Sequence, residues 1–260
     1  MENNARTVLI AAHQREKQAG NAQAQAERQE NAGAMNRLHI VLLTLLSLRG
    51  WAALAQVAKN ANREYLTPQA RGRAAKEMDH PNRKLVEQSP RLVASLGIRP
   101  GEVVADIGTG VGYLLPYLAE AVGPHGRVIA EDIYEDFLSK AQEKIRANGW
   151  TNVITVRGTA KNPKLPFGGV DLALILDTYH HIDYPAEMLG HIRKALKPDG
   201  RLILVDFYRS RKHPGTTDKK LKEHIRADRD EVIREIQRNG FHLTRQFDHL
   251  PHEYVLIFRK

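Results

Sequence analysis

The chain has 260 residues, of which 42% are hydrophobic, and 39 basic against 30 acidic side chains give it a net charge of +9. This length and apolar content suit one α/β domain with an extension, or two small domains, and argue against wholesale disorder. Because the sequence contains no cysteine, disulfides, zinc sites built on thiolates and cysteine nucleophiles are excluded.

The positive charge is unevenly distributed along the chain. Residues 1–100 carry 15 basic and 8 acidic side chains, a net charge of +7, and the segment 208–226 has a net charge of +5. The rest of 101–260 has a net charge of −3. The basic character therefore belongs to appended segments around a mildly acidic core, and it does not by itself indicate a nucleic-acid-binding protein.

The amino-terminal residues 1–56 are expected to form a tail with a signal-like apolar segment. Residues 1–34 are rich in Ala, Gln and Asn and have few large apolar side chains. Segment 35–55 then has the three parts of an export signal: a basic start at Met35, an apolar run of eleven residues and an Ala-x-Ala site. This pattern slightly favours export to the periplasm over a cytoplasmic location.

The alternative for the apolar run is a buried or amphipathic helix that packs on the domain, and membrane contact through 38–55 is a further option. Residues 57–100 are expected to be a basic connector and a helical lid. Within them, the sequence predicts a short helix at Pro90–Leu96 that is closed by Gly97.

A regular alternation of strands and helices begins at Gly101. An apolar strand at 103–105 leads into the turn Asp106-Ile-Gly-Thr-Gly-Val-Gly112, and apolar residues then recur at helical spacing. A second strand ends at Glu131-Asp132, and the helix after it is closed by Gly149. This order predicts a βαβ unit with a glycine turn after its first strand and an acid after its second.

The spacing of these residues suits a nucleotide-like ligand. Glycines at 108, 110 and 112 allow a sharp turn and leave room for a ligand beside the backbone. An acid 20 residues beyond Gly112 is placed to accept hydrogen bonds from ribose hydroxyls. Asp106 stands two residues before the first glycine, where a carboxylate suits an ammonium group. The Gly-x-Gly-x-Gly spacing differs from that of dinucleotide-binding turns and disfavours a nicotinamide-dependent enzyme.

These residues resemble motif I of the class I S-adenosylmethionine-dependent methyltransferases. Later segments continue the resemblance, namely 128–133, 170–177 and the turn Lys197-Pro198-Asp199-Gly200. The resemblance covers residues 101–260 and implies an S-adenosylmethionine-binding methyltransferase domain. The implied fold is α/β, a Rossmann-like doubly wound sheet of seven strands, mostly parallel with terminal antiparallel strands, after a helical amino-terminal extension.

The resemblance also implies a set of cofactor-binding residues for S-adenosyl-L-methionine. Glycines 108, 110 and 112 would border the cofactor, Asp106 would lie near its amino-acid end and Asp132 would bind its ribose. The chain lacks the acid that the family often carries after its third strand. Thr159 or the backbone around it would therefore contact the adenine, and Asp177 would lie beside the cofactor.

The candidate reaction site follows the fourth predicted strand. Asp177, His180 and His181 fall there, and a histidine could remove a proton from the acceptor near neutral pH. The alternative is that the two histidines pack or cap the next helix. A metal site on His180, His181 and Asp183 is not expected, because neighbours on a tight turn rarely converge on one ion.

The sequence thus predicts a methyltransferase that acts on a small molecule, by direct transfer with alignment or general-base assistance. The basic segment 208–226 would attract an anionic acceptor, or it is simply a solvated face. The alternative function is a nucleic-acid-binding or RNA-modifying protein that uses the basic tail and this segment, although aromatic residues do not alternate with its basic ones.

Overall fold

The computed structural model describes residues 56–80, 84–211, 216–248 and 250–260. The predicted tail and the signal-like segment lie outside the described residues, so export and membrane contact stay predictions. Among the described helices, none has the length and apolar character that a bilayer crossing needs.

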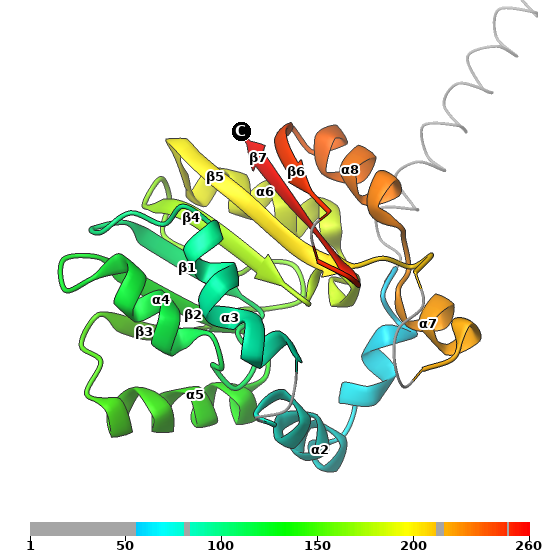
Figure 1. Cartoon of the computed structure of the whole chain (residues 1–260), viewed down its shortest axis with the longest axis horizontal. Coiled ribbons are helices and arrows are strands. Elements are labelled where there is room, and N and C mark those ends of the chain that lie inside the picture. Colours follow the sequence, from blue (N-terminus) through cyan, green and yellow to red (C-terminus); the bar gives the residue numbers. More distant parts are fainter. Residues whose placement is uncertain (1–55, 81–83, 212–215, 249) are drawn as a thin grey trace, which may run out of the picture. The chain divides into compact units, whose positions relative to one another are not determined.

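Seven strands form one sheet in the order β3-β2-β1-β4-β5-β7-β6 (Figure 1). Strands β1 to β5 pair in parallel, and β7 pairs antiparallel with both of its neighbours. This confirms the predicted fold class. The strands are β1 Val103–Ile107, β2 Arg127–Asp132, β3 Val153–Arg157, β4 Val170–Leu176, β5 Leu196–Phe207, β6 His242–Phe247 and β7 Glu253–Arg259.

Helices cover both faces of the sheet (Figure 1). One face packs against α3 Lys84–Ser95, α4 Leu115–Val122 and α5 Glu135–Asn148, and the other packs against α6 Pro185–Ala195 and α8 Arg229–Arg238. Four further elements are the 3-10 helices η1 Ala61–Tyr65 and η2 Tyr179–His181 and the helices α2 Pro68–Met78 and α7 Asp218–His224.

The apolar runs of the central strands supply both faces of the core. In β4, Leu172 and Leu174 pack with the α3–α5 face, whereas Ala173 and Ile175 pack with the α6–α8 face. All four side chains are fully buried. Because successive strand residues point to opposite faces, a strand covered on both sides is apolar throughout rather than alternating.

Local signals in the sequence place most helix ends correctly. Gly149 ends α5 in the left-handed conformation, and Asp228 and Glu231 form the expected capping box at the start of α8. The helix predicted at Pro90–Leu96 begins earlier, at Lys84. The basic segment 208–226 also contains α7, a helix that was not predicted.

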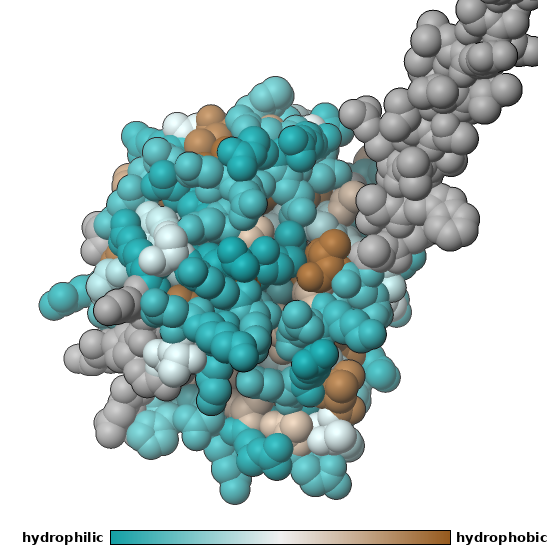
Figure 2. All heavy atoms as spheres, turned by 90° about the vertical axis from the view of Figure 1, so that its right-hand side faces the viewer, coloured by the Kyte–Doolittle hydropathy of each residue, from teal (hydrophilic) through white to brown (hydrophobic). Residues whose placement is uncertain are grey.

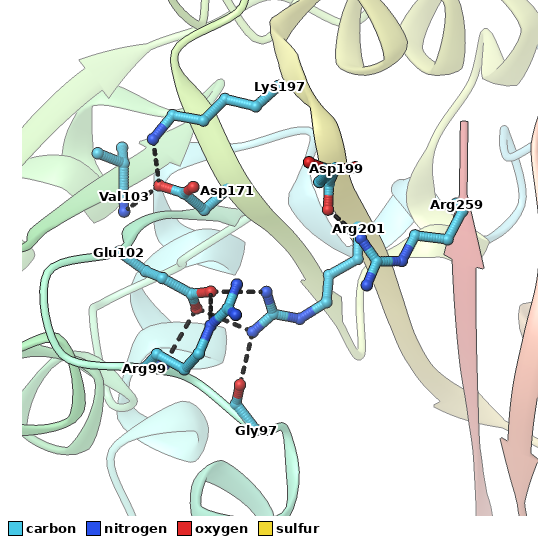
Figure 3. A network of polar contacts seen from close by, with 9 residues as sticks. All are labelled: Gly97, Arg99, Glu102, Val103, Asp171, Lys197, Asp199, Arg201 and Arg259. Atoms are coloured by element: carbon cyan, nitrogen blue, oxygen red, sulfur yellow. Dashed lines mark hydrogen bonds and ion pairs between the residues drawn. The ribbon is translucent and has the colours of Figure 1, made fainter.

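A buried ion pair joins the amino-terminal ends of β1 and β5 (Figure 3). Arg201 donates to both carboxylate oxygens of Glu102, at 3.0 and 2.9 Å, and to the carbonyl oxygen of Gly97 at 2.8 Å. Arg99 contacts the same carboxylate at 2.9 Å. Burial alone would raise the pKa of Glu102, but the hydrogen bonds from Arg201 and Arg99 outweigh it and lower the pKa to about 2.

We expect Arg201→Met to destabilise the fold by about 3–5 kcal/mol, because it leaves the buried Glu102 carboxylate without its main partner. Urea denaturation at pH 7 measures this change. The control is Arg157→Met, which removes an exposed ion pair with Glu135 and should cost less than about 1 kcal/mol. Equal effects of Arg201→Met and Arg157→Met would contradict the role of the buried ion pair.

Because the pKa of Glu102 is lowered on folding, the stabilising contribution of its ionised carboxylate should also disappear as the pH falls from about 4.5 toward 2.

Candidate active site

A cavity of about 610 Å³ opens at the carboxyl ends of the parallel strands. Residues that follow or end β1, β2, β4 and β5 line it, and η1, α2 and α7 supply its outer wall. The outer surface on the side of α7 is mostly hydrophilic, with isolated hydrophobic residues (Figure 2). Leu66, which is 73% exposed, also lines the cavity. The volume lies within the range of about 300–1,000 Å³ that is typical of small-molecule sites.

The glycine turn brings backbone to the cavity wall. Gly108 has a φ of 72°, and a β-carbon there would lie 2.2 Å from Cγ2 of Thr178. Gly110 has a φ of 57°, and its N–H donates to the carboxylate of Asp132 at 2.9 Å. The turn therefore needs glycine at 108 for two reasons: the left-handed backbone and the close approach of the segment after β4.

Two predicted acids lie at this turn. Asp132 lines the cavity and accepts hydrogen bonds from the backbone of Gly110 and Tyr134, both at 2.9 Å. Asp106 is buried behind the turn and accepts a hydrogen bond from the hydroxyl of Thr109, which itself lines the cavity. Burial raises the pKa of both carboxyls to about 6, although these hydrogen bonds act in the opposite direction.

Glu131 is a third buried acid at the cavity, and no role for it was predicted. Its side chain is 1% exposed, and one carboxylate oxygen is 3.4 Å from the N–H of Gly108. Its other oxygen is buried and has no hydrogen-bond partner. Burial raises the pKa of Glu131 well above its ordinary value, and the charge of Asp132 adds to this. Three buried acids thus surround the turn, and those that are ionised, chiefly Asp106 and Asp132 at neutral pH, favour a cationic ligand.

A polar network orients the two predicted histidines. His180 Nδ1 lies 2.6 Å from the carboxylate of Asp206, which also accepts the backbone N–H groups of His180 and Phe207. His181 Nδ1 lies 3.0 Å from Oδ1 of Asn62, while Nδ2 of Asn62 donates to the carbonyl oxygen of His181. Because both Nδ1 atoms face oxygen acceptors, Nε2 is the nitrogen that carries the lone pair in each neutral ring.

His224 on α7 joins this pair and was not predicted. Its ring lies 5.0 Å from that of His180 and 5.1 Å from that of His181, measured between centroids. Burial lowers the pKa of His224, and it lowers that of His181 well below its ordinary value with the help of the charges of His180 and His224. The neutral imidazoles of His181 and His224 are therefore favoured at pH 7.

Asp177, the third predicted catalytic residue, follows β4 and lines the same cavity. Its φ is 52°, a left-handed conformation that is uncommon for a residue with a side chain. Such backbone strain is frequent at functional sites. Asp177, His180 and His181 thus all face the space that also borders Gly108, Gly110 and Asp132.

The part of the expected connector and helical lid that precedes α3 contains η1 and α2, and residues of both line the cavity. The backbone N–H of Ala58 donates to Asp183 at 3.2 Å, and the ring of Tyr65 packs edge-on against His181. Arg71 on α2 forms an ion pair of 2.7 Å with Asp136 on α5. These contacts fix the segment against the elements that carry the predicted site residues.

Two other predicted site residues, Gly112 and Thr159, do not line the cavity. Gly112 faces Leu115 and Ala141, so its close contacts are with the protein interior. Thr159 is exposed and bonds to Asn162, and Ala160 lines the cavity in its place. The adenine contact, which was assigned to Thr159 or the backbone around it, therefore stays a prediction, with Ala160 as the neighbour that lines the cavity.

The basic segment 208–226 contributes a histidine to the cavity wall. Among its described residues, His224 alone lines the cavity. Its arginines bind other groups: Arg209 donates to the carbonyl oxygen of Ile225, Arg211 to that of Leu250, and Arg226 to Glu235. These three arginines do not line the cavity, so attraction of an anionic acceptor by the segment stays a prediction.

Comparisons with known proteins agree with this geometry. Residues 105–202 match the model of a methyltransferase domain family. A solved S-adenosylmethionine-dependent methyltransferase from Aquifex aeolicus is 25% identical and superposes with a TM-score of 0.65 over 71% of this chain and 96% of that one. Residues 105–202 therefore correspond to a methyltransferase domain, and together these matches support a class I S-adenosylmethionine-dependent methyltransferase. S-adenosylmethionine is accordingly the cofactor that these comparisons support. Its binding by the glycine turn and the acids around it stays a prediction.

Two further methyltransferases resemble parts of the chain. A ubiquinone/menaquinone biosynthesis C-methyltransferase from Ectopseudomonas mendocina is 31% identical over 112 residues, which are 43% of this chain and 44% of the relative. This methyltransferase domain therefore matches less than half of that relative. The mitomycin 7-O-methyltransferase structure, 20% identical, shares the fold with a TM-score of 0.59 over 76% of this chain and 59% of its own length.

We expect Asp132→Ala to weaken S-adenosylmethionine binding at least ten-fold, because it removes a carboxylate that lines the cavity and anchors Gly110. Isothermal titration calorimetry measures the dissociation constant. Asp199→Ala, an exposed acid in the turn within β5, is the matched control and should bind like the wild type. An unchanged constant for Asp132→Ala would refute the placement of the cofactor.

Cofactor affinity should also depend on pH. The pKa values of Asp106 and Asp132 are raised to about 6, so both groups are largely protonated at pH 5 and ionised at pH 7.5. Because S-adenosylmethionine is a sulfonium cation, binding should weaken about ten-fold at pH 5 for each carboxylate that must be ionised. Calorimetry at the two pH values tests this, and Asp132→Ala should flatten the dependence. Equal affinity at both pH values would contradict the role of the acids.

Proposed function

We propose that this protein transfers the methyl group of S-adenosylmethionine to a small-molecule acceptor that binds beside His180 and His181. One observation carries the proposal: the glycine turn with its acids and the histidine cluster line the same cavity. A donor held at the turn and an acceptor held at the histidines would therefore share one enclosed space, as direct transfer requires.

The walls of the acceptor side favour a small, partly apolar molecule. Tyr65, Phe207 and Met188 line the cavity near the histidines, while Arg63 and Glu64 supply charges of both signs. The names of two related proteins, a ubiquinone/menaquinone C-methyltransferase and a mitomycin O-methyltransferase, also point to small-molecule acceptors. The nucleic-acid alternative considered from the sequence has no specific support in these comparisons.

The residues around the acceptor can assist the loss of its proton. S-adenosylmethionine supplies a methyl group that is already activated by the sulfonium, so the protein mainly aligns the two molecules. Asp206 fixes His180 with Nδ1 as the donor, so that Nε2 can accept the proton of an acceptor hydroxyl or amine. The new bond would then form between the acceptor and the methyl carbon as the carbon–sulfur bond breaks, and the electron pair of that bond would remain on sulfur.

A panel of phenols, quinols, amines and carboxylic acids, incubated with methyl-labelled cofactor, tests the proposal. Mass spectrometry should show S-adenosylhomocysteine together with one labelled product class. His180→Gln should reduce turnover about 10²–10⁴-fold, because it removes the oriented proton acceptor, while cofactor affinity stays unchanged. His125→Gln, an exposed residue in the turn before β2, is the control. Cofactor binding without transfer to any member of the panel, or full activity of His180→Gln, would count against the proposal.

A further inference from the structure

We propose that His180, His181 and His224 form a binding site for one divalent transition-metal ion, for which Zn²⁺ is the representative. The proposal concerns metal binding itself and does not depend on methyl transfer. Imidazole nitrogens are common ligands of zinc, copper, iron and nickel, and a site of three histidines with an open position is an established zinc geometry.

The three ligand nitrogens already converge. One potential ligand atom from each of the three residues lies within 4.8 Å of the others. Zinc–nitrogen bonds of about 2.0–2.1 Å in a tetrahedral site require nitrogens roughly 3.4 Å apart, so only small side-chain movements are needed. His180 and His181 come from η2 and His224 comes from α7, so two separate elements hold the group.

Groups behind the rings orient two of the three ligands. Asp206 lies 2.6 Å from Nδ1 of His180, and the amide of Asn62 lies 3.0 Å from Nδ1 of His181 while its nitrogen donates to the His181 carbonyl oxygen. A carboxylate or carbonyl oxygen on the second ring nitrogen of a metal-binding histidine fixes its tautomer and raises its basicity. This arrangement is present here twice, at His180 and at His181.

Asp206 acts as an orienting group rather than as a ligand. A second convergent set joins Asp177, His180 and Asp206, with ligand atoms also within 4.8 Å. However, the carboxylate of Asp206 is 2% exposed and already accepts three hydrogen bonds, from His180 Nδ1 and from the backbone N–H groups of His180 and Phe207. Its oxygens are therefore occupied, which favours the three-histidine set.

The fourth coordination position would face the cavity. All three histidines line it, so an oxygen or nitrogen donor of a small molecule could complete the coordination. Metal binding uses the same nitrogen of His180 as proton acceptance does. In the metal-bound protein, His180 could not accept the proton. The ion would instead lower the pKa of an acceptor group that coordinates it, so that this group loses its proton more easily.

Metal titration of the full-length, untagged chain tests the site. After removal of metals with a chelator, Co²⁺ is added and its visible absorption is followed, and Zn²⁺ affinity is measured by competition with a chromophoric chelator. We expect one ion per chain and the intense absorption of a low-symmetry Co²⁺ site. His224→Gln should weaken binding at least ten-fold and Asp206→Asn about 10–100-fold, whereas His125→Gln should bind like the wild type.

Two further measurements keep the result interpretable. Circular dichroism and cofactor affinity, which do not depend on the histidines, report whether each variant is folded. If His224→Gln does not fold, Asn62→Leu replaces it and should also weaken Zn²⁺ binding, because it removes the oxygen that orients His181. Absence of Zn²⁺ binding at hundreds of micromolar, or wild-type affinity in the folded variants, would overturn the proposal and leave the methyltransferase assignment intact.

Discussion

The parallel pairing of β1 with β4 at the centre of the sheet is the constraint on which the site depends. Their register places the turn after Ile107 and the segment after Leu176 side by side, and the hydroxyl of Thr178 donates to the carbonyl oxygen of Gly108 at 3.3 Å. The strand order reverses at this pair, which leaves a crevice at the carboxyl edge. The glycine turn and the histidine segment face the same cavity because these two strands are neighbours.

Buried acids lie at both ends of the parallel strands, but they have different partners at the amino and carboxyl ends. At the amino edge, Glu102 is paired with Arg201 and Arg99, and this edge holds the strands in place. At the carboxyl edge, Glu131 and Asp132 lie buried without a cationic partner among the contacts of the described residues, and Asp206 faces an imidazole. Ion pairing therefore stabilises the fold at one edge, whereas the buried acids at the other edge have the perturbed pKa values that are frequent at functional sites.

The sequence allowed the sheet and the glycine turn to be predicted because their determinants are local. Apolar strands, Gly149 and the capping box at Asp228 are short-range signals, and the turn from Asp106 to Gly112 is continuous. The acceptor side could not be predicted in the same way. Asn62 and His181 are 119 residues apart in the sequence, so no short-range pattern connects them. His224 lies in the basic segment 208–226, where the charge pattern gives no sign that this ring lines the cavity. The roles of Glu131 and Asp206 could have been suspected from the sequence, because each is an acid near the carboxyl end of an apolar strand.

The contact between Gly108 and Thr178 links two positions that lie 70 residues apart. A β-carbon at 108 would overlap the side chain of Thr178, and a bulkier side chain at 178 would press on the turn in the same way. Substitution at one position therefore restricts what the other can accept, as long as β1 and β4 keep their register. In the evolution of this domain, the two residues are expected to vary as a pair, with a small residue at 178 wherever the turn keeps its shape.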